Sequence, residues 1–479
     1  MFTQSSRNIG RRFQYTDNLL LILTIFTVTF FVYRDFGIRM LFGFGALILA
    51  LLLHLLRRLK ADRPLTAVSL QLPYLWLCLV ILLNFLRPDA RHDADSTAYI
   101  LSMLVCCAVL LLASPDDREG QRCLDILLWA GLLMALFVIF FSVFEDLYQD
   151  TLYHILTPTA RDYLTYFLPQ GYAVTLGGCT YTCYILFFGL AVCAASIYSS
   201  PKWTRRSTFL LLCYGLILLA MVLVGRRGEL LGALFCSALL FLIMCPPRRR
   251  MQVIFGGILA LAVTLCLMIL FLPELKQIGF LQRYIATLEN LLSGQDVTTG
   301  RLTLYRNALD AFWSKPIFGI GWDQFYKMVP GHYTTNPVVT IEDVHCIYLQ
   351  FFCETGIVSA PLIIAPLFYY YYLICALLRQ LMPRRTESPE LGRIFAMCVT
   401  SFLIQTFILF VGIYDPNFQR IIFWCFYVLA LILGNRALIC SGWRPTDPVS
   451  RWLDRLAAAL APAGTRLWNT IRTPWKEGN

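Results

Sequence analysis

Apolar runs of about the length that crosses a lipid bilayer recur along almost the whole chain. A helix needs about twenty apolar residues to span the hydrocarbon core, because each residue adds about 1.5 Å. Hydrophobic residues make up 58% of the 479 residues, and charged residues only 14%. The sequence therefore predicts an integral membrane protein and strongly disfavours a soluble fold.

Helices are favoured over strands within these runs. A transmembrane barrel requires polar and apolar residues to alternate, and such alternation is absent. The predicted fold class is all-α, a polytopic membrane protein with about twelve transmembrane helices. The expected spans are 18–33, 38–56, 68–86, 97–113, 123–144, 173–198, 207–224, 229–245, 253–272, 357–378, 394–413 and 418–434. The first apolar run is expected to be a membrane span and not a cleaved signal peptide. It ends in Tyr33, Arg34 and Asp35, whereas a cleavage site requires small residues.

Lysine and arginine accumulate in nearly every second connection between the predicted spans; the connection around Asp116 and Arg118, with little net positive charge, fits least well. Cytoplasmic loops carry this excess in membrane proteins. The pattern predicts that both termini are cytoplasmic, and that the large loop between spans nine and ten, at about 273–346, is extracytoplasmic. The connection at 145–172 is expected on the same side. The net charge of +11 is therefore mainly a topology signal with a contribution to binding membrane lipids, and it does not indicate a nucleic acid partner.

Basic and apolar residues alternate after the last predicted span. Arg444, Trp452, Arg455 and Leu460 are examples. A segment of this kind lies along a membrane surface, although a segment that binds a partner protein is the alternative. We therefore expect a polytopic membrane domain at 1–435 and a cytoplasmic basic amphipathic tail at 436–479.

Seventeen cysteines are scattered through the apolar spans. They lack the spacing of metal ligands and are typical of small core residues. The sequence therefore predicts neither a metal site nor a cofactor.

Two arginines lie in the short connection between the seventh and eighth predicted spans. Arg226 and Arg227 fall on the expected outer side, where connections of membrane proteins usually contain few basic residues. They could contact lipid headgroups and pair with Glu229. Alternatively, a guanidinium group in a cleft offers two parallel hydrogen bonds to a phosphate.

The large outer loop contains a second candidate segment. Gly300 and Arg301 open a predicted helix that ends before Lys315 and a following proline. Arg301 and Arg306 of this helix could equally be ordinary surface residues.

A lone histidine near the end of this loop is the third candidate. Thr340 and Asp343 have the spacing of a helix capping box, so His345 is expected in an early turn of a helix. A packing role is one interpretation. The other is catalytic, because an imidazole in a cleft can take a proton from a hydroxyl group near neutral pH.

Together these segments resemble the O-antigen ligase and O-antigen polymerase family. Residues 225–231 are similar to the family's arginine motif, 300–321 to its Gly-Arg motif and P-x-x-G-x-G turn, and 344–357 to its histidine segment and E-x-G. The resemblance covers about 222–378, with the same order and similar spacing. Two positions depart from the family pattern: Cys346 stands where asparagine is usual, and Arg226 where serine is preferred.

The resemblance implies a metal-independent, inverting glycosyltransferase of the cell membrane that acts in the synthesis of lipopolysaccharide, capsule or another cell-envelope polysaccharide. Its donor would be an oligosaccharide linked to a polyprenyl diphosphate such as undecaprenyl diphosphate, and its acceptor a hydroxyl group of a glycan, lipid or protein. His345 would be the catalytic base. Arg227, Arg301 and the neighbouring Arg226 would bind the diphosphate on the extracytoplasmic side.

Four further residues are weaker candidates for supporting roles. Arg306 and Glu354 belong to the matching segments. Asp415 could orient a base or cap a turn, and Arg420 could join the arginine cluster. The tyrosine-rich outer segment 153–166 could shape the acceptor side or form an interfacial helix.

A transporter, or a flippase of lipid-linked glycans, is the alternative from another functional class. Secondary transporters commonly have two related halves and ionisable residues at mid-membrane. Here the large loop follows the ninth predicted span and not the sixth, and few charges lie at the centres of the spans. Both features favour an enzyme over a transporter.

Overall fold

The computed structural model describes residues 19–38, 40–60, 68–112, 117–271, 281–298, 300–328, 343–416, 418, 421–460 and 462. Within these residues every regular element is a helix, so the predicted all-α class is confirmed. Nine of the described helices are long and apolar enough to cross a membrane, and three shorter apolar helices lie at Leu19–Val28, Phe42–Leu56 and Leu70–Phe85. A multi-pass membrane protein is therefore confirmed, whereas the sidedness of its connections stays a prediction.

The helices occupy the regions that hydropathy predicted. The apolar helices are α2 (Leu19–Val28), α4 (Met40–Lys60), α5 (Val68–Phe85), α6 (Ala94–Leu112), α7 (Asp117–Val143), α11 (Cys179–Ser199), α12 (Arg205–Val224), α13 (Arg227–Met244), α14 (Pro247–Leu270), α18 (Ile347–Leu381), α19 (Pro389–Val411) and α20 (Ile421–Ser441). The connecting helices are α3 (Phe30–Asp35), α8 (Glu145–Asp150), α9 (Leu152–Ile155), α10 (Pro158–Phe167), η1 (Leu168–Gln170), α16 (Gln282–Leu292), α17 (Arg301–Ser314) and η3 (Phe325–Met328).

Helices α11, α19 and α20 form the centre of the bundle, where 89%, 94% and 94% of their apolar stretches are buried. The rings of Phe187 on α11 and Phe407 on α19 stack with their centroids 3.9 Å apart. Helix α7 crosses α11 closely, since a Cβ atom on Gly131 would lie 2.6 Å from the Cα atom of Gly189. Dense packing of this kind gives a rigid support for the residues at the helix ends.

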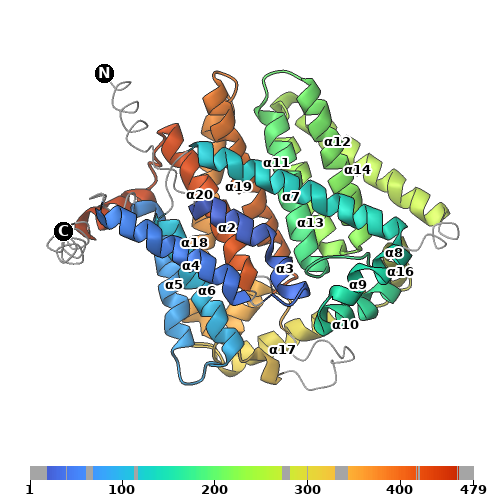
Figure 1. Cartoon of the computed structure of the whole chain (residues 1–479), viewed down its shortest axis with the longest axis horizontal. Helices are drawn as coiled ribbons and strands as arrows, with labels where there is room; N and C mark the ends of the chain where they lie inside the picture. The colour runs from blue at the N-terminus through green and yellow to red at the C-terminus, as the bar shows by residue number, and fades with distance from the viewer. Residues whose placement is uncertain are drawn as a thin grey trace.

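Connections that the charge pattern assigns to the outer side gather at one end of the bundle. Helices α8, α9, α10, α16 and α17 all lie toward the lower end in Figure 1. The connection between α11 and α12 contains Lys202 and ends at Arg205, so the charge pattern assigns it to the cytoplasm, and it lies at the opposite end (Figure 1). The outer connections are therefore close enough in space to build one site.

The P-x-x-G-x-G turn packs against a break near the start of α18. Gly356 interrupts that helix with a φ of 71°, and a Cβ atom on Gly319 would lie 2.3 Å from the backbone carbon of Glu354. The amide groups of Ile320 and Gly321 donate to the carbonyl oxygens of the facing segment, at 2.9 and 3.0 Å. Helix α18 begins at Ile347 and is interrupted at Gly356, so the predicted span 357–378 starts where the helix resumes after the break.

Helix α20 extends to Ser441, beyond its predicted end at 434. Arg436 lies inside this helix, is 2% exposed and pairs with Glu119 at 2.6 Å. A charged side chain is buried only when it is paired, so Arg436 belongs to the bundle and not to the tail. A short helix at 448–460 follows, in which Trp452 is 59% exposed. Most of the remaining tail, 463–479, lies outside the described residues.

Candidate active site

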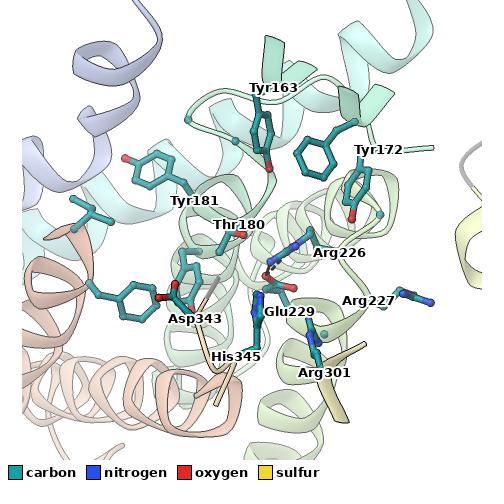
Figure 2. Close-up of a pocket in the computed structure, with 18 of the residues that line it drawn as sticks. Tyr163, Tyr172, Thr180, Tyr181, Arg226, Arg227, Glu229, Arg301, Asp343 and His345 are labelled. Atoms are coloured by element: carbon teal, nitrogen blue, oxygen red, sulfur yellow. Dashed lines mark hydrogen bonds and ion pairs between the residues drawn. The ribbon is translucent and has the colours of Figure 1, made fainter. Parts of the chain in front are cut away.

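A cavity of about 990 Å³ opens at the end of the bundle where the predicted outer connections meet. Arg226, Arg227, Arg301 and His345 all line it. Figure 2 shows that Arg226, Arg301 and His345 point toward the same space, whereas Arg227 points away from Arg226. The structure thus brings together the four principal candidates, which lie on three separate segments of the chain.

The arginine motif forms the turn between α12 and α13. Gly225 ends α12 with a φ of 77°, a left-handed conformation that favours glycine. Arg226 donates to the carboxylate of Glu229 at 2.9 Å and to that of Asp415 at 3.3 Å. Arg227 donates to the hydroxyl group of Thr287 on α16. The two neighbouring guanidinium groups therefore have different partners: Arg226 contacts two carboxylates, and Arg227 contacts a hydroxyl group.

Two carboxylates compensate the charge of Arg226. Burial lowers the pKa of Arg226, but Glu229 and Asp415 outweigh this effect and hold the pKa well above its ordinary value. The arginine is therefore permanently charged and held in place within the wall of the cavity.

Helix α17 presents Arg301 to the cavity. Asp296 accepts hydrogen bonds from the amide groups of Thr298 and Gly300, both at 2.7 Å, which shapes the turn before the helix. Gly300 has a φ of 84°, and Arg301 is the first helical residue. Its guanidinium group lies 6.0 Å from the ring centroid of Tyr414. The Gly-Arg motif thus starts the helix at the point where its first side chain reaches the cavity.

His345 precedes α18 and is not in an early turn of it, which corrects the sequence prediction. The helix begins at Ile347, and His345 has a φ of 56°. Thr340 of the expected capping box lies outside the described residues. The amide of Ile347 donates to the carbonyl oxygen of Gly412 at 2.8 Å, and the hydroxyl group of Tyr305 to that of His345 at 3.1 Å. These bonds hold the backbone of His345 in a conformation that is uncommon outside glycine. The half-buried imidazole ring lies beside the cavity.

A turn at 412–415, between α19 and α20, joins the three motif segments. The carbonyl oxygen of Gly412 accepts a hydrogen bond from the amide of Ile347 in the histidine segment, and that of Ile413 accepts one from the hydroxyl group of Tyr305 on α17. The hydroxyl group of Tyr414 donates to the carbonyl oxygen of Gly228, next to Arg227, and the carboxylate of Asp415 pairs with Arg226. Sequence reasoning identified only Asp415 of this turn, as a supporting candidate.

Two further arginines, Arg34 and Arg283, line the cavity and were missed in the sequence. The guanidinium carbon of Arg283 lies 3.5 Å from the ring centroid of Tyr172. Burial lowers the pKa of Arg283, and the nearby Arg227 and Arg226 lower it further. A signal existed, since Arg283 is a basic residue on the predicted outer side. Among the described residues, five guanidinium groups line the cavity together with the carboxylates of Asp95, Glu229, Asp323 and Asp343, and an anionic ligand is favoured where the guanidinium groups face it without a carboxylate partner.

The tyrosine-rich segment contributes part of the opposite wall. Tyr163 and Tyr166 of α10 line the cavity, as does Tyr172. Tyr153, His154 and Arg161 of the same segment are not among the described residues that line it.

The weaker candidates occupy different positions. Arg306 is exposed on α17 and is not among the described residues that line the cavity. Glu354 is buried behind the cavity, where it accepts a hydrogen bond from the amide of Asp323, a lining residue, at 3.0 Å. Asp415 is buried against Arg226, and Arg420 lies outside the described residues.

Residues 209–364 match the sequence model of the O-antigen ligase family. The matched region contains the arginine turn, α17, the P-x-x-G-x-G turn and His345. The family resemblance is therefore confirmed for this part of the chain, and the turn at 412–415 lies beyond it. No curated protein gives a significant match to the chain.

Proposed function

We propose that this protein, which carries an O-antigen ligase region, is a membrane glycosyltransferase of the ligase or polysaccharide polymerase type. It transfers a glycan from a polyprenyl diphosphate-linked donor to an acceptor hydroxyl group on the extracytoplasmic side of the cell membrane. The observation that carries the proposal is one imidazole and a group of arginines around a single cavity at the predicted outer end of the bundle.

His345 is the base in this proposal. Its imidazole takes the proton of the acceptor hydroxyl group, and the oxygen forms a bond to the anomeric carbon of the donor sugar. The bond between that carbon and the diphosphate oxygen breaks, and its electron pair leaves with the polyprenyl diphosphate. Attack from the face opposite to the leaving group inverts the anomeric configuration.

Arg227, Arg301 and Arg283 bind the diphosphate in this proposal. The leaving group gains negative charge as the bond breaks, and guanidinium groups stabilise that charge most strongly in a water-poor cavity. These cations take the part that a metal ion plays in other transferases, so we expect transfer to continue in the presence of a chelator. Arg226 is already compensated by two carboxylates, and we assign to it the support of the arginine turn.

Transfer by the purified protein in detergent tests the proposal. The assay supplies a polyprenyl diphosphate-linked oligosaccharide together with lipid A core, a second lipid-linked repeat or a peptide, and detects the glycosylated product by mass spectrometry. Product formation in detergent separates an enzyme from a flippase, because no vectorial transport can occur there. The acceptor that is used identifies the protein as a ligase, a polymerase or a protein glycosyltransferase.

His345→Ala is expected to abolish transfer while the protein remains folded. The matched control is His92→Ala, which removes an exposed imidazole from the connection before α6. Thermal unfolding of both variants measures folding independently of activity. Transfer retained by a folded His345→Ala protein would remove His345 from the mechanism.

A further inference from the structure

Tyr305 and His345 are joined through the backbone of the histidine segment. Tyr305 lies one turn after Arg301 on α17, and its hydroxyl group donates to the carbonyl oxygens of His345 at 3.1 Å and Ile413 at 3.3 Å. A phenol has one proton, so the two carbonyl groups share it. One helix therefore provides both an arginine at the cavity and a fixed contact to the segment that carries the imidazole.

This contact acts on a residue in an uncommon conformation. The φ of His345 is 56°, a conformation that is unfavourable for a residue other than glycine and persists only where the surroundings hold it. Burial raises the pKa of Tyr305, so its phenol stays protonated and able to donate at the pH of ordinary assays. The hydrogen bond is thus available throughout the range in which an imidazole changes its charge.

We propose that Tyr305 is a positioning residue whose hydrogen bond to the carbonyl oxygen of His345 holds the imidazole in the orientation that accepts the acceptor's proton. Tyr305 is not among the described residues that line the cavity, so it acts through His345 and not on the substrate. The inference rests on the proposed function, in which His345 is the base.

Tyr305→Phe removes the hydroxyl group and keeps the ring. The kcat for transfer is expected to fall by about 10- to 100-fold, since a small misplacement of a catalytic group has effects of this size. The KM for the lipid-linked donor is expected to stay within about twofold of wild type, because the arginines are unchanged. A general loss of structure would instead change both constants.

Tyr348→Phe is the matched control. Tyr348 lies in the first turn of α18, and its hydroxyl group donates to the carbonyl oxygen of Leu409 at 2.7 Å. The control therefore also loses a partly buried hydrogen bond near His345, but one that does not involve His345. Its kcat is expected to remain close to the wild-type value.

A second measurement does not depend on activity. Diethyl pyrocarbonate modifies the neutral imidazole ring. The chain has five histidines, and peptide mass spectrometry measures the modification rate of His345 separately from those of the others. Tyr305→Phe is expected to accelerate modification of His345, because the segment loses one of the bonds that hold it. Tyr348→Phe is expected to leave that rate unchanged.

Equal kcat values for the two phenylalanine variants would overturn the proposal, as would an unchanged modification rate at His345 in Tyr305→Phe. If the proposed role of His345 as the base is wrong, the folded His345→Ala protein retains transfer, whatever the activity of the Tyr305→Phe protein. An inactive His345→Ala protein together with a fully active Tyr305→Phe protein refutes the positioning role alone.

Discussion

Tyr414 donates a hydrogen bond from its hydroxyl group to the backbone carbonyl oxygen of Gly228, at 2.6 Å. Its ring lies so close to the same residue that a Cβ atom on Gly228 would be 2.5 Å from the Cε2 atom of Tyr414. Gly228 follows Arg227 in the arginine turn, and Tyr414 belongs to the turn that contacts the histidine segment. This contact therefore connects the proposed diphosphate site to the proposed base.

Gly228→Ala is expected to separate the two turns. The added methyl group displaces the ring of Tyr414, and overpacking of this kind costs about 1–3 kcal/mol. We expect a lower midpoint of thermal unfolding and a loss of transfer. Gly256→Ala on α14 is the control, since nothing lies within 4 Å of its Cβ position. Equal midpoints for the two variants would show that the contact with Tyr414 does not constrain the turn.

Asp415→Asn is expected to weaken the support of the arginine turn. The carboxylate is 2% exposed and lies 3.3 Å from Arg226, so its loss leaves that guanidinium group with less compensation. In a double-mutant cycle with Arg226→Gln, we expect a coupling energy of at least about 1 kcal/mol for thermal stability. A coupling energy of zero would mean that the ion pair does not stabilise the turn.

Arg301→Ala is expected to raise the KM for the donor and to lower kcat, with kcat/KM falling by about 100-fold or more. The reason is the loss of one charge that stabilises the leaving diphosphate. Arg306→Ala removes an exposed guanidinium group from the same helix, outside the cavity lining among the described residues, and serves as the control. Steady-state kinetics of both variants distinguish a local role from a general effect of positive charge, which would give equal losses.

Arg283→Lys is expected to make transfer sensitive to alkaline pH. Burial and the nearby Arg227 and Arg226 lower the pKa of Arg283, and the same surroundings would lower the pKa of a lysine below its ordinary value of about 10.4. A basic group with a lowered pKa is charged at low pH and loses its charge as the pH rises. Donor KM is therefore expected to increase between about pH 8 and 10 in the variant and not in the wild type. Superimposable pH profiles would argue against a diphosphate contact at this position.

Gly319→Ala is expected to detach the P-x-x-G-x-G turn from α18. Its φ of 71° disfavours any side chain, and the new Cβ atom would also meet the backbone of Glu354 at 2.3 Å. Gly294→Ala has nearly the same φ, 68°, but nothing within 4 Å of the Cβ position. Thermal unfolding should therefore show a clearly larger loss for Gly319→Ala. Similar losses would attribute the effect to backbone strain alone.

The positions of the helices could be predicted because the bilayer penalises any unpaired polar backbone group or charge. Hydropathy placed one span at 207–224, for example, and α12 occupies Arg205–Val224. The break at Gly356 divides α18 into two parts: the second begins at 357, as hydropathy predicted, and the first begins at Ile347, a few residues after the start that Thr340 and Asp343 indicated. The exact start could not be read from a local pattern, because the hydrogen bonds from Ile347 to Gly412 and from Tyr305 to His345 join distant parts of the chain.

The sequence by itself determined the all-helical membrane class and the chemically distinctive residues Arg226, Arg227, Arg301 and His345. Only the tertiary structure decided what each of them faces. Arg226 and Arg227 are adjacent and chemically identical, yet Arg226 pairs with a carboxylate 189 residues away and Arg227 does not share that partner. The direction of a side chain depends on the surfaces that packing brings to it, and these surfaces come from parts of the chain that no local pattern connects.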